Sequence, residues 1–288
     1  MKPIRRALAL LALAAVAVAA PPSLAGGGLS VTIATPYAGQ LRTFNLYVAP
    51  RVPTRTPVPL LIVLHGLYLD PASSEANSGL DSVGDGQDVA LAYPAGIGSS
   101  WNAGNCCGQA HRDNVDDIGF LVHVVDLIRQ VRPIDLDRVY VAGFSNGGMM
   151  ALRAVCDRPD VFAAAVSVSG TLQTPCAGRL ALNAMLIHGL RDTTVPYYGE
   201  AHSTFLGVPI TAVPTAAARL ASRSGCTANR VTAAKRYLHK QYTGCSRASS
   251  IQLLTVPTMA HRWPDLARDG VDGGTLTWTF LQAQRRLA

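Results

Sequence analysis

Hydrophobic residues along this chain follow two spacings that alternate over most of its length. Short apolar runs predict strands, and runs with few polar interruptions are typical of strands buried on both faces of a sheet. Six such runs occur, at residues 58–66, 88–94, 138–144, 162–170, 183–189 and 250–257. Residues 29–35 and 42–50 predict an antiparallel pair that opens the fold.

Helical spacing appears between these runs. Residues 115–131 have two acidic residues near their start, Asp116 and Asp117, which suit the helix dipole. They place one apolar face at Ile118, Leu121, Val124, Val125 and Ile128. Residues 147–156, 214–225 and 274–288 predict further helices. Strands that alternate with helices predict an α/β fold with a mainly parallel sheet and helices on both faces. We expect one such domain over residues 26–288, because no repeat or long linker interrupts the pattern.

The N-terminus has the layout of a secretory signal peptide. Lys2, Arg5 and Arg6 precede an apolar run at residues 7–20, and small residues lead to a cleavage site after Ala25. The alternative is a membrane anchor, but a spanning helix needs about 20 apolar residues. We therefore expect residues 1–25 to be removed and the mature protein to be secreted or periplasmic, without a membrane segment.

Composition narrows the functional classes. Of the 288 residues, 49% are hydrophobic and 15% are charged, which allows a large core and argues against global disorder. The formal charge of +7 falls to +4 when the three basic residues of the signal are removed. No cluster of Lys and Arg is interleaved with aromatic residues, so we do not expect a nucleic-acid partner.

The six cysteines are an even number, which in an exported chain indicates disulfides. They are Cys106, Cys107, Cys156, Cys176, Cys226 and Cys245. We expect Cys226 and Cys245 to close the polar, loop-like stretch between them. We expect the adjacent Cys106 and Cys107 each to bond elsewhere, with Cys156 and Cys176. Buried free thiols are the alternative, and the absence of paired C-x-x-C spacing argues against a metal site.

One serine lies in a glycine-rich turn. Residues 143–147, GFSNG, fit the pattern G-x-S-x-G between a predicted strand and a predicted helix, which is the context of a nucleophile elbow. Glycines at Gly143 and Gly147 avoid Cβ collisions in such a tight turn. A phosphate-binding loop is the alternative, but its lysine and the dinucleotide fingerprint are both missing. We expect the Ser145 hydroxyl at the carboxyl edge of the sheet.

A nucleophilic serine needs a base that is oriented by an acid, and on this scaffold they follow in the order serine, acid, histidine. Asp192 follows the strand at 183–189 and is the predicted acid, with Glu200 as its rival. Asp160 lies too soon after the serine helix, and Asp265 and Asp269 come after the candidate histidine.

His261 is the predicted base, because it follows the strand at 250–257 after a short turn. The other six histidines fit less well. His123 falls inside a predicted helix and His188 ends a strand. His65 and His111 precede the acid, whereas His202 and His239 lie in polar, loop-like stretches.

Two backbone amides are predicted to stabilise the oxyanion of the reaction. One is the N–H of Asn146, directly after the serine, and the other is the N–H of Leu67 in the loop after the strand at 58–66. Trp263, two residues past His261, either contacts the substrate or packs the loop. Tyr197 and Tyr198 carry the same two interpretations.

Several segments together resemble a known family. They are "LHG", "YPAG", "SSWNAGNCCGQAHRDNVDDIGFL", "GFSNGG", "IHGLRDTTVPYYG" and "AHRWP". The chain is similar to secreted esterases of the polyhydroxybutyrate depolymerase and feruloyl esterase type, which are α/β-hydrolases related to carbohydrate esterase family one. The resemblance implies Ser145, Asp192 and His261 as catalytic residues.

It also implies that Trp101 and the paired-cysteine loop border the active site, with disulfides bracing them, and we expect Trp101 to contact the substrate together with Trp263 and Tyr197. Two segments depart from the family pattern, "TMA" before His261 and "LYLDPASS" after "LHG". Both bear on the shape of the pocket more than on the mechanism.

These observations predict a secreted serine esterase that needs no metal or organic cofactor. The expected substrate is a polyester oligomer or a feruloyl or acetyl ester of plant polysaccharide. A non-catalytic binding protein on the same fold and a peptidase on the same scaffold are the alternatives. The binding protein would lack a triad member, and such peptidases usually carry a large extra domain.

Overall fold

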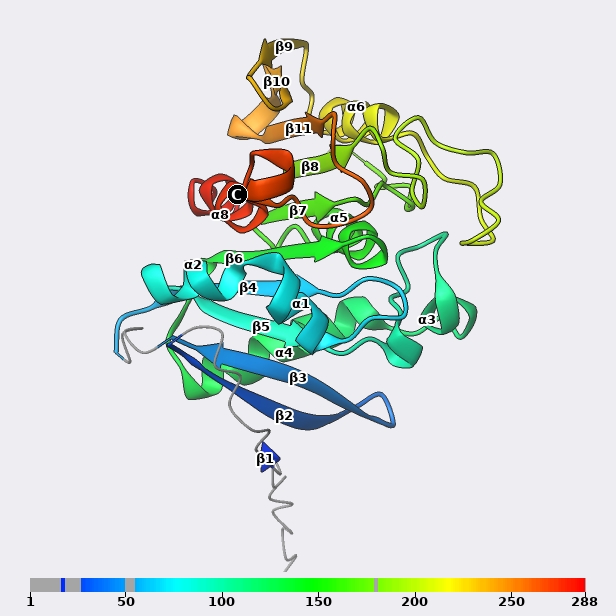
Figure 1. Cartoon of the computed structure of the whole chain (residues 1–288). Coiled ribbons are helices and arrows are strands. Elements are labelled where there is room, and N and C mark those ends of the chain that lie inside the picture. The colour runs from blue at the N-terminus through cyan, green and yellow to red at the C-terminus, as the bar shows by residue number, and fades with distance from the viewer. Residues whose placement is uncertain (1–16, 19–26, 50–54, 179–180, 288) are drawn as a thin grey trace, which may run out of the picture.

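A computed structural model describes residues 17–18, 27–49, 55–178 and 181–287 (Figure 1). One twisted sheet runs through this part of the chain, with the strand order β1-β2-β3-β5-β4-β6-β7-β8-β11-β10-β9. Parallel strands form its middle, and antiparallel strands extend it at both ends. The predicted fold class, a mainly parallel α/β sheet, is confirmed.

The parallel strands are the six that the apolar runs predict. They are β4 (Val58–Leu64), β5 (Ala90–Pro94), β6 (Ile134–Phe144), β7 (Ala164–Val168), β8 (Asn183–Gly189) and β11 (Ser250–Val256). Every residue of β4, β5, β7 and β8 is buried. These strands lack polar alternation because helices cover both of their faces.

The two ends of the sheet differ in how well the sequence predicts them. At one end β2 (Leu29–Tyr37) and β3 (Gln40–Val48) form the expected antiparallel pair. At the other end β10 (Leu238–Thr243) and β9 (Ala228–Ala233) form a hairpin that was expected to be a loop, and it includes His239. All six residues of β9 are exposed, so the apolar pattern that marks a strand is weak there.

Helices lie on both sides of the sheet (Figure 1). The first side carries α1 (Pro71–Ser78), α2 (Leu80–Gly86) and α8 (Gly273–Gln282), and the opposite side carries α4 (Asp117–Val131) and α5 (Asn146–Asp157). α6 (Val213–Arg223) packs on β8 and β11. The short helices are α3 (Gly108–Arg112) and α7 (Leu266–Asp269), with single turns at η1 (Ile97–Ser99) and η2 (Ser246–Ala248).

Helix α4 shows how sequence sets these elements. Asp116 caps it by accepting a hydrogen bond from the N–H of Gly119. Four of the five predicted face residues are buried, and Phe120 joins them whereas Ile118 is only partly covered. The last predicted helix, expected over residues 274–288, is shorter and ends at Gln282.

The predicted signal peptide lies outside the described residues except for β1 (Ala17–Val18), which pairs with β2. In the part of the chain that the structure describes, no helix is both long enough and apolar enough to cross a bilayer.

Candidate active site

Ser145 lies in the turn between β6 and α5 with φ of 54°, a left-handed conformation that is unusual for serine. A Cβ at Gly143 would overlap the carbonyl of Gly147, and a Cβ at Gly147 would overlap the carbonyls of Leu64 and His65. The serine N–H donates to the carbonyl of Val168, 2.8 Å away, which ties the turn to β7. Such strain persists only where the surroundings fix the turn, and it is common at functional sites.

The three predicted catalytic side chains meet at the carboxyl edge of the sheet. His261 Nε2 lies 3.0 Å from Ser145 Oγ, and His261 Nδ1 lies 2.8 Å from Asp192 Oδ2. The serine follows β6, the aspartate follows β8 and the histidine follows β11. Ser145 and Asp192 are buried, whereas the imidazole is partly exposed and packs against the ring of Phe144 in a tilted arrangement, with 4.8 Å between the ring centroids.

Asp192 is held as a carboxylate by several donors. It accepts hydrogen bonds from the backbone N–H groups of Thr194 and Val195, and from His261. His188 Nε2 lies 3.3 Å from the same carboxylate, a partner that the sequence did not indicate. Burial alone raises the pKa of Asp192, but the hydrogen bonds from His188 and His261 outweigh it and hold the pKa well below its usual range. Its rival, Glu200, is exposed and bridges Ile210 through its backbone.

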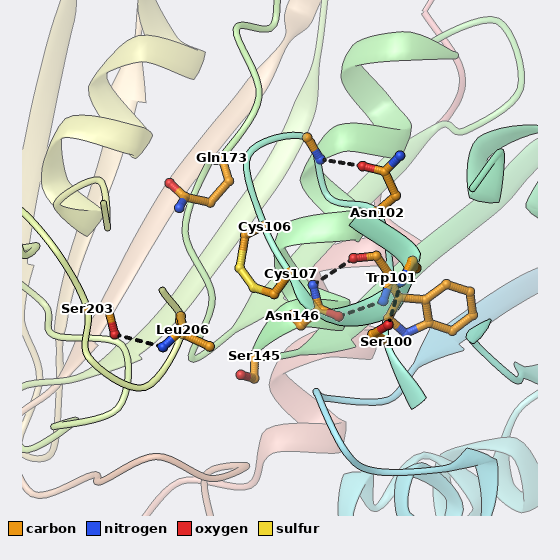
Figure 2. The surroundings of a disulfide bond; sticks show 12 residues. Ser100, Trp101, Asn102, Cys106, Cys107, Ser145, Asn146, Gln173, Ser203 and Leu206 are labelled. Atoms are coloured by element: carbon orange, nitrogen blue, oxygen red, sulfur yellow. Dashed lines mark hydrogen bonds between the residues drawn. A yellow bond between two sulfur atoms is a disulfide. The ribbon is translucent and has the colours of Figure 1, made fainter. Parts of the chain in front are cut away.

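The side chain of Asn146 brackets the loop that contains Trp101 (Figure 2). Its Oδ1 accepts from the Trp101 N–H at 2.7 Å, and its Nδ2 donates to the Trp101 carbonyl at 3.0 Å. The N–H of Asn146 opens α5, where backbone donors have no acceptor within the helix. The bracket therefore fixes one of the two predicted oxyanion amides, a role for the side chain that sequence reasoning missed.

Trp101 borders the serine turn, as the resemblance implied, but its side chain is not placed for the substrate contact that we expected. It is fully buried, and its indole N–H donates to the carbonyl of His65 at 3.0 Å. A substrate does not reach a side chain in that position. The indole instead joins the loop of Trp101 to His65, directly after β4. The second predicted oxyanion amide, that of Leu67, lies two residues further along the chain.

The loop that carries the Leu67 amide is held by His65. His65 Nε2 accepts from the N–H of Gly96 at 2.9 Å, so its proton is on Nδ1, 2.8 Å from the carbonyl of Gly66. Burial lowers the pKa of His65, which agrees with this neutral form. The N–H of Tyr68 donates to the carbonyl of Ser99 and anchors the far side of the loop.

The cysteines pair differently from the expectation in one respect. Cys226 and Cys245 are joined as predicted, and they close the base of the β9–β10 hairpin. Cys106 and Cys107 were expected to bond with Cys156 and Cys176, which is wrong. Cys156 at the end of α5 bonds with Cys176, and the two adjacent cysteines bond with each other. Their buried disulfide lies between Gln173 and the Ser145–Asn146 turn (Figure 2).

The remaining aromatic candidates separate into packing and lining residues. Tyr197 bonds through its hydroxyl to Thr255 Oγ1 at 2.8 Å and packs against His188, which favours the packing interpretation. Trp263 is nearly buried, but it lines a cleft of about 350 Å³ that also contains His261 and Phe144. Tyr198 is mostly exposed.

Comparison with known proteins finds a matching family model and several related proteins. The model of the prolyl oligopeptidase family matches residues 94–175, a region that contains Ser145. "Putative esterase NocK" of Nocardia uniformis subsp. tsuyamanensis is 39% identical over 49% of this chain and 41% of its own length. "Feruloyl esterase B" of Piromyces equi is 27% identical over 78% of this chain and 42% of its own length. "Poly(3-hydroxyalkanoate) depolymerase C" of Paucimonas lemoignei is 32% identical over 44% of this chain and 31% of its own length. The chain therefore spans less than half of the length of each of these relatives.

Solved structures match over more of the chain. "Acetyl xylan esterase from Aspergillus awamori" superposes with a TM-score of 0.59 over 81% of this chain and 94% of that one, at 14% identity. An S-formylglutathione hydrolase from Agrobacterium tumefaciens superposes with a TM-score of 0.56 over 93% of this chain and 99% of that one, at 13% identity. This chain has the α/β-hydrolase fold. In an α/β-hydrolase the loops at the carboxyl edge carry the chemistry, and here they bring Ser145, Asp192 and His261 into contact.

Proposed function

We propose that this α/β-hydrolase is a secreted serine esterase whose catalytic residues are Ser145, Asp192 and His261. The observation that carries the proposal is the unbroken chain of hydrogen bonds from Ser145 Oγ through the imidazole to Asp192, at 3.0 and 2.8 Å. A serine hydroxyl becomes an effective nucleophile only beside such a base. The esterase names of the relatives agree with this proposal.

Each residue has a defined step in the proposed reaction. Asp192 accepts the Nδ1–H of His261, which leaves Nε2 free to take the proton of Ser145 as its oxygen attacks the ester carbonyl. The oxyanion is stabilised by the amides of Asn146 and Leu67, each worth roughly 3–4 kcal/mol of barrier. His261 then protonates the leaving alcohol, and water releases the acyl group from the serine.

We propose polyester oligomers or feruloyl and acetyl esters of plant polysaccharide as the substrate class. The relatives include proteins named for each of these activities. The match to the prolyl oligopeptidase model is the one observation in favour of the peptidase alternative. The matched region contains the serine turn but neither Asp192 nor His261. Because esterases share that turn, the match does not favour peptide bonds over esters.

We also propose export from the cytoplasm, to the periplasm or the medium. The basic and apolar N-terminus has the composition of a signal peptide. Three disulfides occur among the described residues, as is typical of proteins that mature in an oxidising compartment.

The test is hydrolysis by the exported protein, purified with its disulfides intact. p-Nitrophenyl butyrate, methyl ferulate and amorphous polyhydroxybutyrate would be compared with a peptide p-nitroanilide. We expect ester hydrolysis that Ser145→Ala reduces by roughly 10⁴- to 10⁶-fold. Full activity in Ser145→Ala would refute the serine mechanism, and no hydrolysis of any ester by folded protein would favour the non-catalytic alternative. A faster reaction with the anilide would favour the peptidase.

A further inference from the structure

The cleft of about 350 Å³ beside His261 has a polar side that the proposed mechanism does not use. It lies between the segment that runs from Gly66 into α1 and the segment that runs from His261 into α7. Phe144 and Trp263 are the aromatic residues of its lining. Arg262 and Arg268 provide two positive charges in the same wall as the imidazole.

The position of His261 indicates which part of a substrate occupies this cleft. In the proposed reaction His261 gives its proton to the oxygen of the leaving alcohol, so that oxygen lies within hydrogen-bond distance of the imidazole. The rest of the alcohol then extends into space that the imidazole borders. The cleft beside His261 is such a space, and Trp263, which is largely buried, is part of its lining.

Arg262 is oriented by a buried carboxylate. Its Nη2 donates to Asp269 Oδ1 at 2.7 Å, and Asp269 also accepts from Thr258 Oγ1 and from the N–H of Asp265. Asp269 is buried with its oxygens bonded, whereas the buried Nε of Arg262 has no acceptor within the described part of the chain. A guanidinium has five N–H donors, so Arg262 keeps donors for a ligand.

Arg268 is the freer of the two cations. It lies on α7 with an exposed side chain, and no described residue forms an ion pair or hydrogen bond with its guanidinium. The exposed carboxylate in this wall belongs to Asp265, which accepts the backbone N–H of Arg268 at 3.0 Å and so caps the helix. The cleft wall therefore has two guanidinium groups and one exposed carboxylate, and the carboxylate is already engaged as a helix cap.

We propose that this cleft binds the leaving alcohol and that Arg268 and Arg262 select alcohols that carry a carboxylate. The preferred substrates are then esters in which one hydroxy acid is acylated by another group and keeps a free acid end. This inference rests on the proposed esterase function and narrows its substrate class. It predicts a preference for the acid end of an oligomer over interior bonds, whose leaving groups carry no charge.

The reaction balances without any further reactant. Ser145 Oγ forms a bond to the acyl carbon, and the bond from that carbon to the hydroxy-acid oxygen breaks. The proton that His261 took from the serine passes to this oxygen, so the product leaves as a hydroxy-acid anion. Water then cleaves the acyl-serine bond and restores both side chains.

The test compares two substrates that differ only in the charge of the leaving group. They are the linear dimer of 3-hydroxybutyrate with a free carboxylate and the methyl ester of that dimer. We expect the wild type to have a kcat/KM about fivefold higher for the free acid, as suits one partly exposed ion pair. Arg268→Gln should bring this ratio close to one, whereas Arg268→Lys should keep most of it.

Arg129→Gln is the matched control, because it removes the same charge from an exposed side chain on the opposite face of the sheet. It should keep the wild-type ratio. A ratio of one or less in the wild type, or the same ratio in wild type and Arg268→Gln, would overturn the inference. Serine-dependent hydrolysis of p-nitrophenyl butyrate in the same preparations would show that the proposed esterase function survives that result.

A binding measurement tests the cleft without catalysis. The 3-hydroxybutyrate anion would be titrated into the full protein while NMR follows the indole N–H of Trp263. We expect a shift that saturates, that weakens several-fold in Arg268→Gln and that weakens as salt rises. No shift, or equal affinity in Arg268→Gln and Arg129→Gln, would overturn the inference even if no ester were hydrolysed.

Discussion

The serine side and the histidine side of this site are built differently. On the serine side, Asn146 and Trp101 are buried and joined by two hydrogen bonds, and His65 holds the neighbouring loop. On the histidine side, the imidazole is partly exposed and the segment that follows it includes the exposed Arg268. The difference agrees with the proposal that the serine side fixes the geometry of the reaction and that the histidine side contacts the leaving alcohol.

Hydrogen bonds also connect the serine side to α4 and β3. The N–H of Asn102 donates to the buried Asp117 at 2.8 Å, and Asp117 pairs with the buried Arg42 at 2.9 Å. Burial raises the pKa of Asp117 and lowers that of Arg42, so desolvation outweighs the attraction between the two charges. Such a pair adds little net stability, but removing one partner leaves the other charge uncompensated.

The largest expected effect is on kcat, when Asp192, the acid that contacts His261, is replaced. Asp192→Asn should lower kcat by roughly 10⁴-fold while the protein stays folded, because the amide no longer holds His261 in the reactive tautomer. Glu200→Gln, at the rival acid, should keep wild-type activity. Steady-state kinetics of both variants decide between the two acids, and a reversed result would assign the role to Glu200.

The next effect concerns stability on the serine side. Asp117→Asn should lower the free energy of unfolding by about 3–5 kcal/mol, because it leaves Arg42 buried without a counter-charge. Asp126→Asn on the same helix breaks an exposed pair with Arg129 and should change the free energy by less than about 1 kcal/mol. Chemical denaturation measures both, and equal losses would contradict the contrast between buried and exposed pairs.

Asn146→Ala tests whether the bracket positions the oxyanion amide. The backbone N–H remains in this variant, but the two bonds to Trp101 are lost. We expect kcat to fall by roughly 10- to 100-fold with little change in KM, because a small misplacement of a transition-state donor is costly. A rise in KM at constant kcat would instead indicate that Asn146 contacts the substrate directly.

The pKa of Asp192 predicts a pH dependence of stability. Because the folded state depresses this pKa, the stability that the carboxylate contributes is fully present above the unfolded value of about 4 and is lost as pH falls through the folded value. The difference in unfolding free energy between wild type and Asp192→Asn should therefore be constant from pH 5 to 8 and shrink at strongly acid pH. A difference that grows on acidification would contradict this sign.

The smallest expected effect is on stability, when the exposed Arg268 on the histidine side is replaced. Arg268→Gln should change the free energy of unfolding by no more than about 0.5 kcal/mol, since its side chain has no described partner. Thermal unfolding beside Arg129→Gln provides the comparison. A loss above about 1 kcal/mol would show that Arg268 supports the fold, which would weaken its assignment to a ligand.

Short apolar runs and the order of residues along the chain were enough to predict the three candidate catalytic residues. Ser145, Asp192 and His261 each follow a short apolar run, and parallel strands bring their carboxyl ends to one edge. The expected substrate contact of Trp101 disagrees with its burial, because a motif shows that a residue belongs to a loop but not whether its ring faces solvent or core. The β9–β10 hairpin was missed because its exposed, polar strands lack the apolar spacing that marks buried ones.

The sequence by itself determined the α/β architecture and the serine turn, because apolar spacing and glycines act over a few residues. Only the tertiary structure decided the pairing of Cys106 with Cys107, the second histidine beside Asp192 and the two arginines beside the cleft. The cleft joins segments that lie far apart in the chain, so no local spacing predicts it. Cys106 and Cys107 are adjacent, and His188 lies four residues before Asp192. Whether these side chains meet depends on how each loop turns and which of its faces is buried, and packing of the whole molecule decides that.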